Sequence, residues 1–156
     1  MKILLTAGPT REPIDEVRFL SNRSSGRVGL SLARAARDAG HRVTLLLGPV
    51  CGGDDLPENV ELIRFGSTAD LQRELDARFE HCDALIMAAA VADYRPADVV
   101  HGKTPRAHDP TSEMTIRLEP TPDLVAALAA RKREDQLVIA FALEEEAFSL
   151  DEPREL

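Results

Sequence analysis

Short apolar runs recur along the chain and predict buried strands. The first is Ile3–Ala7, which ends at Gly8-Pro9, a pair that favours a turn. The same pattern recurs at residues 43–47, 60–65, 84–88 and 137–141. Five such runs predict a parallel sheet of buried strands.

Helical spacing of apolar residues separates these runs, at residues 28–39, 71–79 and 123–132. The first of these segments ends at Gly40, and the second follows Ser67-Thr68. Strands that alternate with helices predict a doubly wound α/β fold: a mainly parallel sheet of five to six strands with helices on both faces. The sixth strand would be 114–118, at the sheet edge or in a flap. Ligands of such folds bind beyond the carboxyl ends of the strands.

The composition fits one domain without a membrane span. A chain of 156 residues with 44% apolar content can bury one core, but not two comfortable ones. No run approaches the roughly 18 apolar residues of a membrane span, and the start lacks a signal peptide, so we expect a cytoplasmic protein. Cys51 and Cys82 lack metal or disulfide spacing and predict reduced thiols. The net charge of −8 argues against a nucleic-acid partner.

The connection after the first predicted strand is unusually long. Strand-to-helix loops usually run about 2–6 residues, and here the loop extends from Gly8 to Ser24. Gly26 and Gly29 would allow close approach at the start of the next helix, which Ser24 or Ser25 can cap. Backbone N–H groups at a helix start attract phosphate or carboxylate oxygens.

The basic side chains of Arg23 and Arg27 would add to the positive electrostatic potential at the start of this helix. The loop therefore predicts an anion site. It contains neither a dinucleotide-binding glycine fingerprint nor a P-loop, which argues against a nicotinamide-dependent reductase. Asn22 can donate to a carbonyl oxygen and accept from an amine without changing charge. The alternative is that Asn22 and the serines only stabilise a turn.

A second motif, Ala-Ala-Ala-Val-Ala-Asp-Tyr-Arg-Pro at 88–96, follows the fourth predicted strand. Its small side chains leave room for a base or ribose, and Asp93 could accept from a sugar hydroxyl or hold a divalent cation. Arg95 could contact phosphate. The alternative makes Asp93 a turn residue and the alanines simple packing.

Lys103 follows in a polar loop, as a candidate phosphate ligand or as an ordinary solvated lysine. The nearby His101 and His108 have no organised partners for a metal site.

Three motifs together, TAGPTREPIDEVRFLSNRSSGRVG at 6–29, AAAVADYRP at 88–96 and PTPDL at 120–124, closely resemble the phosphopantothenoylcysteine synthetase (CoaB-like) family. The resemblance implies a Rossmann-like fold and a homodimer. It also implies a ligase of coenzyme A biosynthesis that activates 4′-phosphopantothenate with CTP, or ATP, and Mg²⁺ or Mn²⁺. Cysteine then displaces the nucleotide from the acyl-nucleotide.

The same resemblance implies roles for individual residues. Asn22 would act at the acyl-nucleotide carbonyl, Arg23 beside it would help to bind phosphopantothenate, and Lys103 would close over the phosphates. Asp93 would be the metal ligand. The resemblance also places Ala88, Ala89, Ala90, Asp93, Pro122, Asp123, Leu124 and Phe141 around the nucleotide. The anion site predicted at the first loop adds Gly8, Ser24, Ser25 and Gly26 as nucleotide-binding positions.

The chain departs from the family pattern at three places. The lysine loop reads Gly-Lys-Thr-Pro-Arg, which leaves Arg106 as its second cation, and Phe141 is followed by Ala-Leu-Glu-Glu. We also expect one domain over residues 1–156 that lacks the family's C-terminal segment with its lysines. A shortened, catalytically weak nucleotide- or phosphopantothenate-binding module is therefore the alternative. Because Met1 begins the synthetase strand, we expect no flavin and a separate phosphopantothenoylcysteine decarboxylase.

Overall fold

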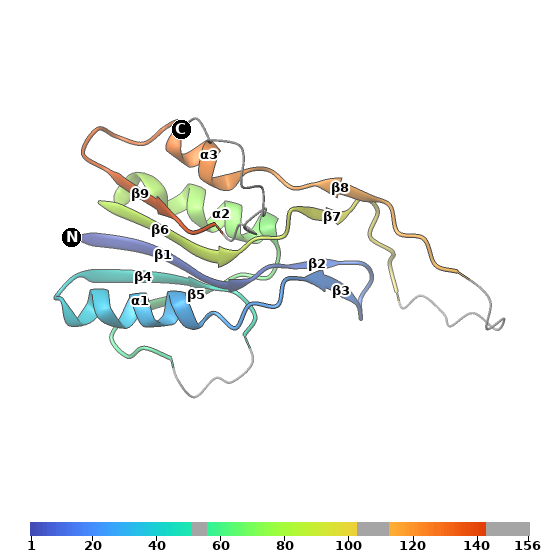
Figure 1. Ribbon diagram of the computed structural model, residues 1–156, viewed down its shortest axis with the longest axis horizontal. Coiled ribbons are helices and arrows are strands. Elements are labelled where there is room, and N and C mark those ends of the chain that lie inside the picture. The colour runs from blue at the N-terminus through green and yellow to red at the C-terminus, as the bar shows by residue number, and fades with distance from the viewer. Residues whose placement is uncertain (51–55, 103–112, 143–156) are drawn as a thin grey trace, which may run out of the picture.

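A five-stranded parallel sheet forms the centre of the computed structural model, which describes residues 1–50, 56–102 and 113–142 (Figure 1). The strand order is β5-β4-β1-β6-β9. From β1 the chain moves outward to β4 and β5, and it then returns to β6 on the other side of β1. The order therefore reverses between β1 and β6, where doubly wound folds bind their ligands. The strands are β1 (Lys2–Pro9), β4 (Arg42–Leu47), β5 (Glu61–Arg64), β6 (Ala84–Ala90) and β9 (Leu137–Ala140).

Helices cover both faces of the sheet. Successive side chains of a strand point to opposite faces, so Leu5 packs in the cluster with α1 (Arg27–Asp38), whereas Leu4 packs in the cluster with α2 (Thr68–Arg78) and α3 (Leu124–Ala129). A short 3₁₀ turn, η2 (Phe79–His81), extends α2. No helix in the described ranges is long and apolar enough to cross a membrane.

The long loop after β1 folds into a hairpin, a feature that the sequence pattern does not predict. Its strands are β2 (Arg11–Pro13) and β3 (Phe19–Ser21). The Asp15 carboxylate stabilises the turn, because it accepts from the backbone N–H groups of Val17 and Arg18.

A second ribbon lies alongside the hairpin, formed by β7 (Tyr94–Pro96) and β8 (Leu118–Pro120) (Figure 1). A strand was predicted at 114–118 for the sheet edge or a flap. In the structure β8 begins only at Leu118, and it pairs with β7 outside the main sheet.

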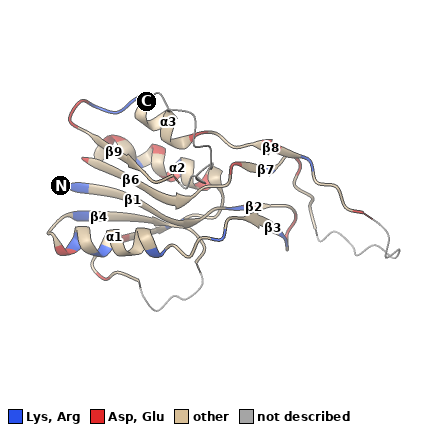
Figure 2. Ribbon diagram, viewed as in Figure 1, with Lys and Arg blue, Asp and Glu red and all other residues tan. Residues whose placement is uncertain are grey.

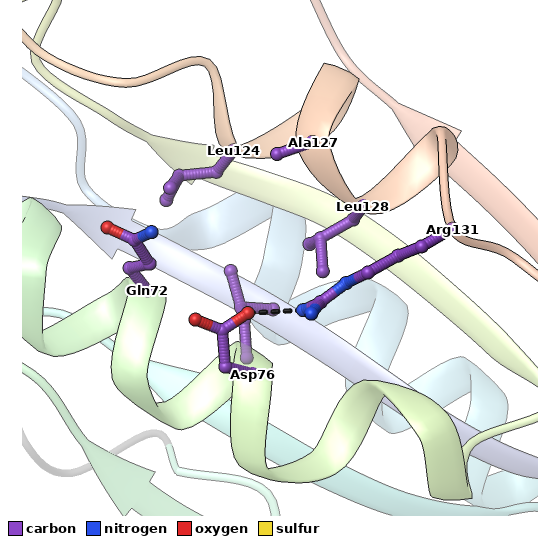
Figure 3. A pocket seen from close by; sticks show the side chains of 7 residues that line it. Gln72, Asp76, Leu124, Ala127, Leu128 and Arg131 are labelled. Carbon is purple, nitrogen blue, oxygen red and sulfur yellow. Dashed lines mark hydrogen bonds and ion pairs between the residues drawn. The ribbon is translucent and has the colours of Figure 1, made fainter.

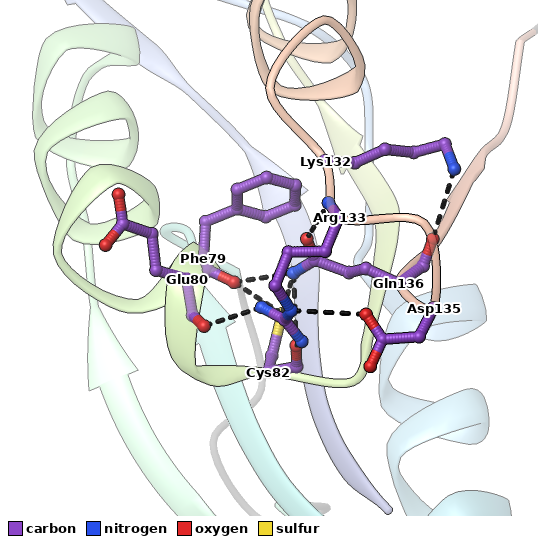
Figure 4. A network of polar contacts seen from close by, with 7 residues as sticks. All are labelled: Phe79, Glu80, Cys82, Lys132, Arg133, Asp135 and Gln136. Atoms are coloured by element: carbon purple, nitrogen blue, oxygen red, sulfur yellow. Dashed lines mark hydrogen bonds and ion pairs between the residues drawn. The ribbon is translucent and has the colours of Figure 1, made fainter.

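Buried polar contacts fasten the connection between α3 and β9 to the turn before β6 (Figure 4). The amide of Gln136, which is 2% exposed, donates to the carbonyl oxygens of Phe79 and Cys82 at 2.6 and 3.0 Å. Arg133 donates to the carbonyl oxygens of Glu80 and Cys82 at 2.6 and 3.0 Å. The bonds from Gln136 satisfy the carbonyl oxygens of the buried residues Phe79 and Cys82, and together these contacts hold β9 beside β6.

The predicted fold class is confirmed: each of the five apolar runs is a strand of the main sheet. The three predicted helices are also present, although α3 ends at Ala129 rather than near residue 132. Helix α1 packs unusually closely on the sheet. An ideal Cβ on its Gly29 would lie 2.4 Å from the Cβ of Ala7 in β1.

The substitution Gly29→Ala should therefore destabilise the protein, by roughly 1–2 kcal/mol, because overpacking outweighs the gain in helix propensity. Ser31→Ala, at an exposed position of the same helix, should instead stabilise it by about 0.5 kcal/mol. Urea unfolding of both variants measures the difference. Equal stability of the two variants would contradict the close packing of α1 on β1.

Candidate functional site

The carboxyl ends of β1 and β6 meet at the point where the strand order reverses. The hydroxyl of Thr6, which is fully buried, accepts hydrogen bonds from the backbone N–H groups of Ala88 and Ala89 at 3.1 and 3.0 Å. The N–H of Thr10 donates to the carbonyl of Ala90 at 3.2 Å. All three alanines are half-buried. The end of β6 is thus a backbone surface with no bulky side chain.

Glycines bring the start of α1 onto this strand end. Gly26 is the N-cap residue and has a φ of 74°, in the left-handed region that favours glycine. A Cβ at Gly26 would lie 3.3 Å from the backbone of Gly8 and 2.8 Å from the Cγ1 of Val50. Only a residue without a side chain fits between them.

The prediction that Ser24 or Ser25 caps α1 is wrong, because no side chain caps this helix. The Ser24 hydroxyl instead accepts from the N–H of Gly26 at 3.3 Å. A left-handed residue at the N-cap changes the direction in which the preceding chain enters the helix, so the serines do not reach the usual capping position.

Asn22 joins the two sequence motifs. Its side-chain Nδ2 donates to the carbonyl oxygen of Val91 at 3.0 Å, across 69 residues of sequence. Asn22 is exposed, and a primary amide has a second N–H donor and a carbonyl acceptor in addition to the donor used here. The turn around Asn22 and the segment after β6 therefore lie together, as the sequence motifs predicted.

Asp93 lies on the surface two residues beyond Val91. Its backbone carbonyl accepts from the N–H of Thr121 at 2.9 Å, and the Thr121 hydroxyl donates to the carbonyl of Ala92 at 2.5 Å. These bonds place the exposed Pro122 beside the end of β6. Asp123 caps α3 through a 2.8 Å bond from the N–H of Ala126.

Other predicted residues have different surroundings. Leu124 is 5% exposed and belongs to the core beneath α2 and α3. Phe141 is 57% exposed, and its N–H donates to the carbonyl of Met87 at 3.2 Å, which extends the strand pairing of β6 and β9. Arg95 pairs with Glu119 at 2.8 Å within the β7–β8 ribbon. Lys103 lies outside the described residues.

Basic residues flank the start of α1 (Figure 2). Arg23 and Arg27 are exposed, on either side of Gly26. Arg11 of the hairpin stacks over the ring of Phe19, with 4.3 Å from its Cζ to the ring centroid. The positive end of the α1 dipole adds to this field, so the site favours an anion.

The described residues contain no group of three or more metal-ligating side chains. Asp93 is a single exposed carboxylate. Magnesium is commonly held by one or two carboxylates together with substrate phosphates. This side chain therefore fits a cation that arrives with a nucleotide, but not a metal held by the protein alone.

Among the described residues, Asp70 and Cys82 have shifted pKa values, and neither belongs to the site. The backbone N–H of Ser67 donates to the carboxylate of Asp70 and, with help from Arg73, lowers the pKa of Asp70 despite the opposing effect of burial. Burial raises the pKa of the Cys82 thiol. That thiol stays protonated at neutral pH and is not a candidate nucleophile.

A pocket of about 220 Å³ lies between α2 and α3 (Figure 3). Leu75, Leu124 and Leu128 form its apolar wall, and an ion pair between Asp76 and Arg131 crosses one side. It contains neither Asn22 nor Asp93. The pocket is therefore a gap between two covering helices and not the site at the strand ends.

The residues that hold the site together were not predicted from the sequence. Thr6, Thr10, Glu12 and Thr68 are all buried polar residues that bond across the strand ends. Thr10 and Glu12 stand within the first motif, but threonine and glutamate are usually exposed. Only the tertiary structure brings them inside.

Comparisons with known proteins show the family to which the chain is similar. Residues 1–153 match the family model described as DNA/pantothenate metabolism flavoprotein C-terminal domain. The chain is 43% identical over 143 residues to a cysteine/cysteine sulfinic acid decarboxylase from an unknown prokaryotic organism, and 42% identical over 142 residues to the coenzyme A biosynthesis bifunctional protein CoaBC of Vibrio vulnificus. These alignments cover 92% and 91% of the chain, which spans 39% and 35% of the two relatives.

A solved structure is similar over almost the whole chain. The crystal structure of the C-terminal domain of a CoaBC protein superposes with a TM-score of 0.78 at 38% identity. The match covers 94% of this chain and 66% of that domain.

The substitution Thr6→Val should destabilise the strand ends, because it leaves the N–H groups of Ala88 and Ala89 without their buried acceptor. We expect a loss of about 1–3 kcal/mol in the free energy of unfolding. Thr44→Val makes the same chemical change in β4, where the hydroxyl donates to the exposed carboxylate of Glu61. Denaturant unfolding should show a clearly smaller loss for Thr44→Val, and the reverse order would refute the role of Thr6.

Proposed function

This chain belongs to the DNA/pantothenate metabolism flavoprotein C-terminal domain family, and we propose that it acts as a phosphopantothenate–cysteine ligase of coenzyme A biosynthesis. The family match supports the resemblance drawn from the sequence motifs. The observation that carries the proposal is the 3.0 Å bond between Asn22 and Val91. It unites the two motifs at the strand ends, where this fold class binds ligands.

The reaction has two steps. A carboxylate oxygen of 4′-phosphopantothenate attacks the α-phosphorus of CTP, the bond to the β-phosphate breaks, and pyrophosphate leaves. The cysteine amine then attacks the carbonyl carbon of the resulting acyl-nucleotide. The C–O bond to the nucleotide breaks, CMP leaves, and the amine nitrogen loses a proton. Activation is required because oxide is a far poorer leaving group than a nucleotide phosphate.

Asn22 is suited to the second step. One N–H of its amide is held by Val91, which fixes the plane of the group. The second N–H can donate to the acyl carbonyl oxygen, which gains negative charge as the amine attacks. A pre-oriented donor of this kind stabilises the transition state. The amide oxygen can accept from the attacking amine.

The nucleotide would lie along the small residues at the end of β6. Ala88, Ala89 and Ala90 leave space for the base and ribose, and Pro122 and Phe141 would border it. Asp123 and Leu124 would contribute through the backbone, since the Asp123 carboxylate caps α3 and the Leu124 side chain is in the core. We place the triphosphate toward the start of α1, beside Gly8, Ser24, Ser25 and Gly26.

Arg23 and Arg27 would supply positive charge to the phosphates, with Arg23 nearer to phosphopantothenate. Asp93 would hold Mg²⁺ or Mn²⁺ together with the phosphate oxygens, and the cation would neutralise charge on the leaving pyrophosphate. Lys103 would add a further cation. We also propose CTP over ATP, a cytoplasmic location, a homodimer, and a separate decarboxylase that consumes the product.

Asn22→Ala should block the second step more than the first. With CTP, Mg²⁺, phosphopantothenate and cysteine, the variant should release pyrophosphate and accumulate acyl-nucleotide, while the coupled product falls about 100-fold, as for loss of one oxyanion donor. Quenched-flow chromatography of the nucleotides measures both steps.

Gln72→Ala is the matched control, because it also removes a side-chain amide, but one that lines the pocket between α2 and α3 and has no part in the chemistry that we assign. Coupled turnover of Asn22→Ala equal to that of the unsubstituted protein would refute the role of Asn22. Tight CTP binding without any pyrophosphate release would instead favour a nucleotide-binding module.

Asp93→Asn should weaken nucleotide binding only when the cation is present. We expect the Kd for CTP in Mg²⁺ to rise about tenfold, the equivalent of one weakened cation contact, and the Kd in EDTA to stay unchanged. Asp98→Asn, at an exposed carboxylate that pairs with Arg117, is the control and should change neither value. Titration calorimetry distinguishes these outcomes. Equal Kd values for Asp93→Asn and the unsubstituted protein in Mg²⁺ would remove Asp93 from the site.

A further inference from the structure

Glu12 is an acidic residue of strand β2 that is buried against the start of α2. It is 3% exposed, and its carboxylate accepts from the backbone N–H of Thr68 at 2.9 Å and from the Thr68 hydroxyl at 2.7 Å. Within the described residues no lysine or arginine forms an ion pair with it. Burying a carboxylate is costly unless its hydrogen bonds are satisfied. Here the first residue of α2 provides two bonds, and the positive end of the helix dipole favours the negative charge.

The Glu12 carboxylate also sets the direction of a chain of hydrogen bonds. A carboxylate oxygen accepts hydrogen bonds, so the Thr68 hydroxyl donates its single hydrogen to Glu12. The Thr68 oxygen lies 3.4 Å from the Thr10 hydroxyl oxygen. Because one hydroxyl hydrogen cannot serve two acceptors, we assign Thr10 as the donor to Thr68, while the Thr10 oxygen accepts from the N–H of Ala92 at 3.0 Å. With this assignment, the hydroxyls of Thr68 and Thr10 each donate once and accept once.

Thr10 connects these hydrogen bonds to residues on both sides of the Asn22–Val91 bond. Ala92 follows Val91, whose carbonyl accepts from Asn22. On the hairpin side, the Ser21 hydroxyl donates to the Thr10 carbonyl at 2.7 Å, and Ser21 precedes Asn22. Thr10, which is fully buried, is thus bonded to the neighbours of both Asn22 and Val91.

We propose that Glu12 is a positioning residue, which acts through Thr68 and Thr10 to fix the Asn22 amide against Val91. It does not touch the substrates. Its effect on catalysis rests on the proposed ligase function, but its effect on the Asn22 amide does not. The end of α2 closest to the site therefore binds a protein carboxylate and orders the reacting loop.

The test uses Thr68→Val, which removes the hydroxyl from the chain at nearly constant volume, and Thr68→Ser, which restores it. The whole polypeptide has four side-chain amide groups, those of Asn22, Asn59, Gln72 and Gln136. Their signals resolve in a ¹⁵N correlation spectrum, and Asn22→Ala identifies that of Asn22. We expect Thr68→Val to raise the hydrogen-exchange rate of the Asn22 amide about tenfold, the effect of one lost hydrogen bond. Thr68→Ser should leave that rate unchanged.

Kinetics give a second measurement on the same variants. In Thr68→Val the kcat for coupling should fall about tenfold with accumulation of acyl-nucleotide, while the KM for CTP changes less than about twofold. Thr68→Ser should recover the kcat. Thr44→Val, far from the hairpin, should affect neither the amide nor the kcat.

An Asn22 amide signal that is identical in Thr68→Val and the unsubstituted protein would overturn the proposal. Should Thr68→Val not fold, Glu12→Gln replaces it; this variant keeps an acceptor oxygen but adds two donors in a buried place. Glu12→Gln should also raise the hydrogen-exchange rate of the Asn22 side-chain amide. An unchanged exchange rate would again overturn the proposal. If the unsubstituted protein releases no pyrophosphate, the ligase function fails, and the amide measurement still decides the positioning role.

Discussion

The structure depends on holding two loops together at the carboxyl ends of β1 and β6. Neither loop has a hydrophobic core of its own, so polar contacts hold the two loops together. The backbone and hydroxyl of Thr10 bond to Ala90, Ala92 and Ser21, and the Asn22 amide closes the contact at Val91. Such a buried network orders the loops only when each member is satisfied, because an unpaired buried group is costly. The geometry of the site therefore follows from the pairing of a few hydroxyls.

The main sheet and its covering helices could be predicted from the sequence because they follow from periodicity. Apolar runs such as Ile3–Ala7 need two covered faces, and the chain supplies helices for both. The hairpin β2–β3 could not be found this way. Each of its strands has three residues, and Glu12 and Asp15 are buried there despite their charge. Their burial depends on partners that are distant in sequence or specific to the turn.

The close approach of backbone segments at the strand ends was predicted from the sequence for a different reason. Glycine and small residues at the strand ends mark places where a backbone must approach something closely, and Gly26 and Ala88–Ala90 do lie there. The joining of Asn22 to the second motif follows from parallel strand order. The serine cap failed because a left-handed glycine occupies the N-cap. Residue preferences predict which side chains cap helices in general. The path of a long loop decides whether such a residue reaches the N-cap position.

The central claim is that the Asn22 turn and the end of β6 form one binding site. A ¹⁵N correlation titration with CTP and Mg²⁺ tests it most directly, because it reports each backbone amide separately. The amides of 22–29 and of 88–93 should shift together and give a single Kd. Shifts confined to one stretch, or two unrelated Kd values, would show that the two loops do not bind a common ligand.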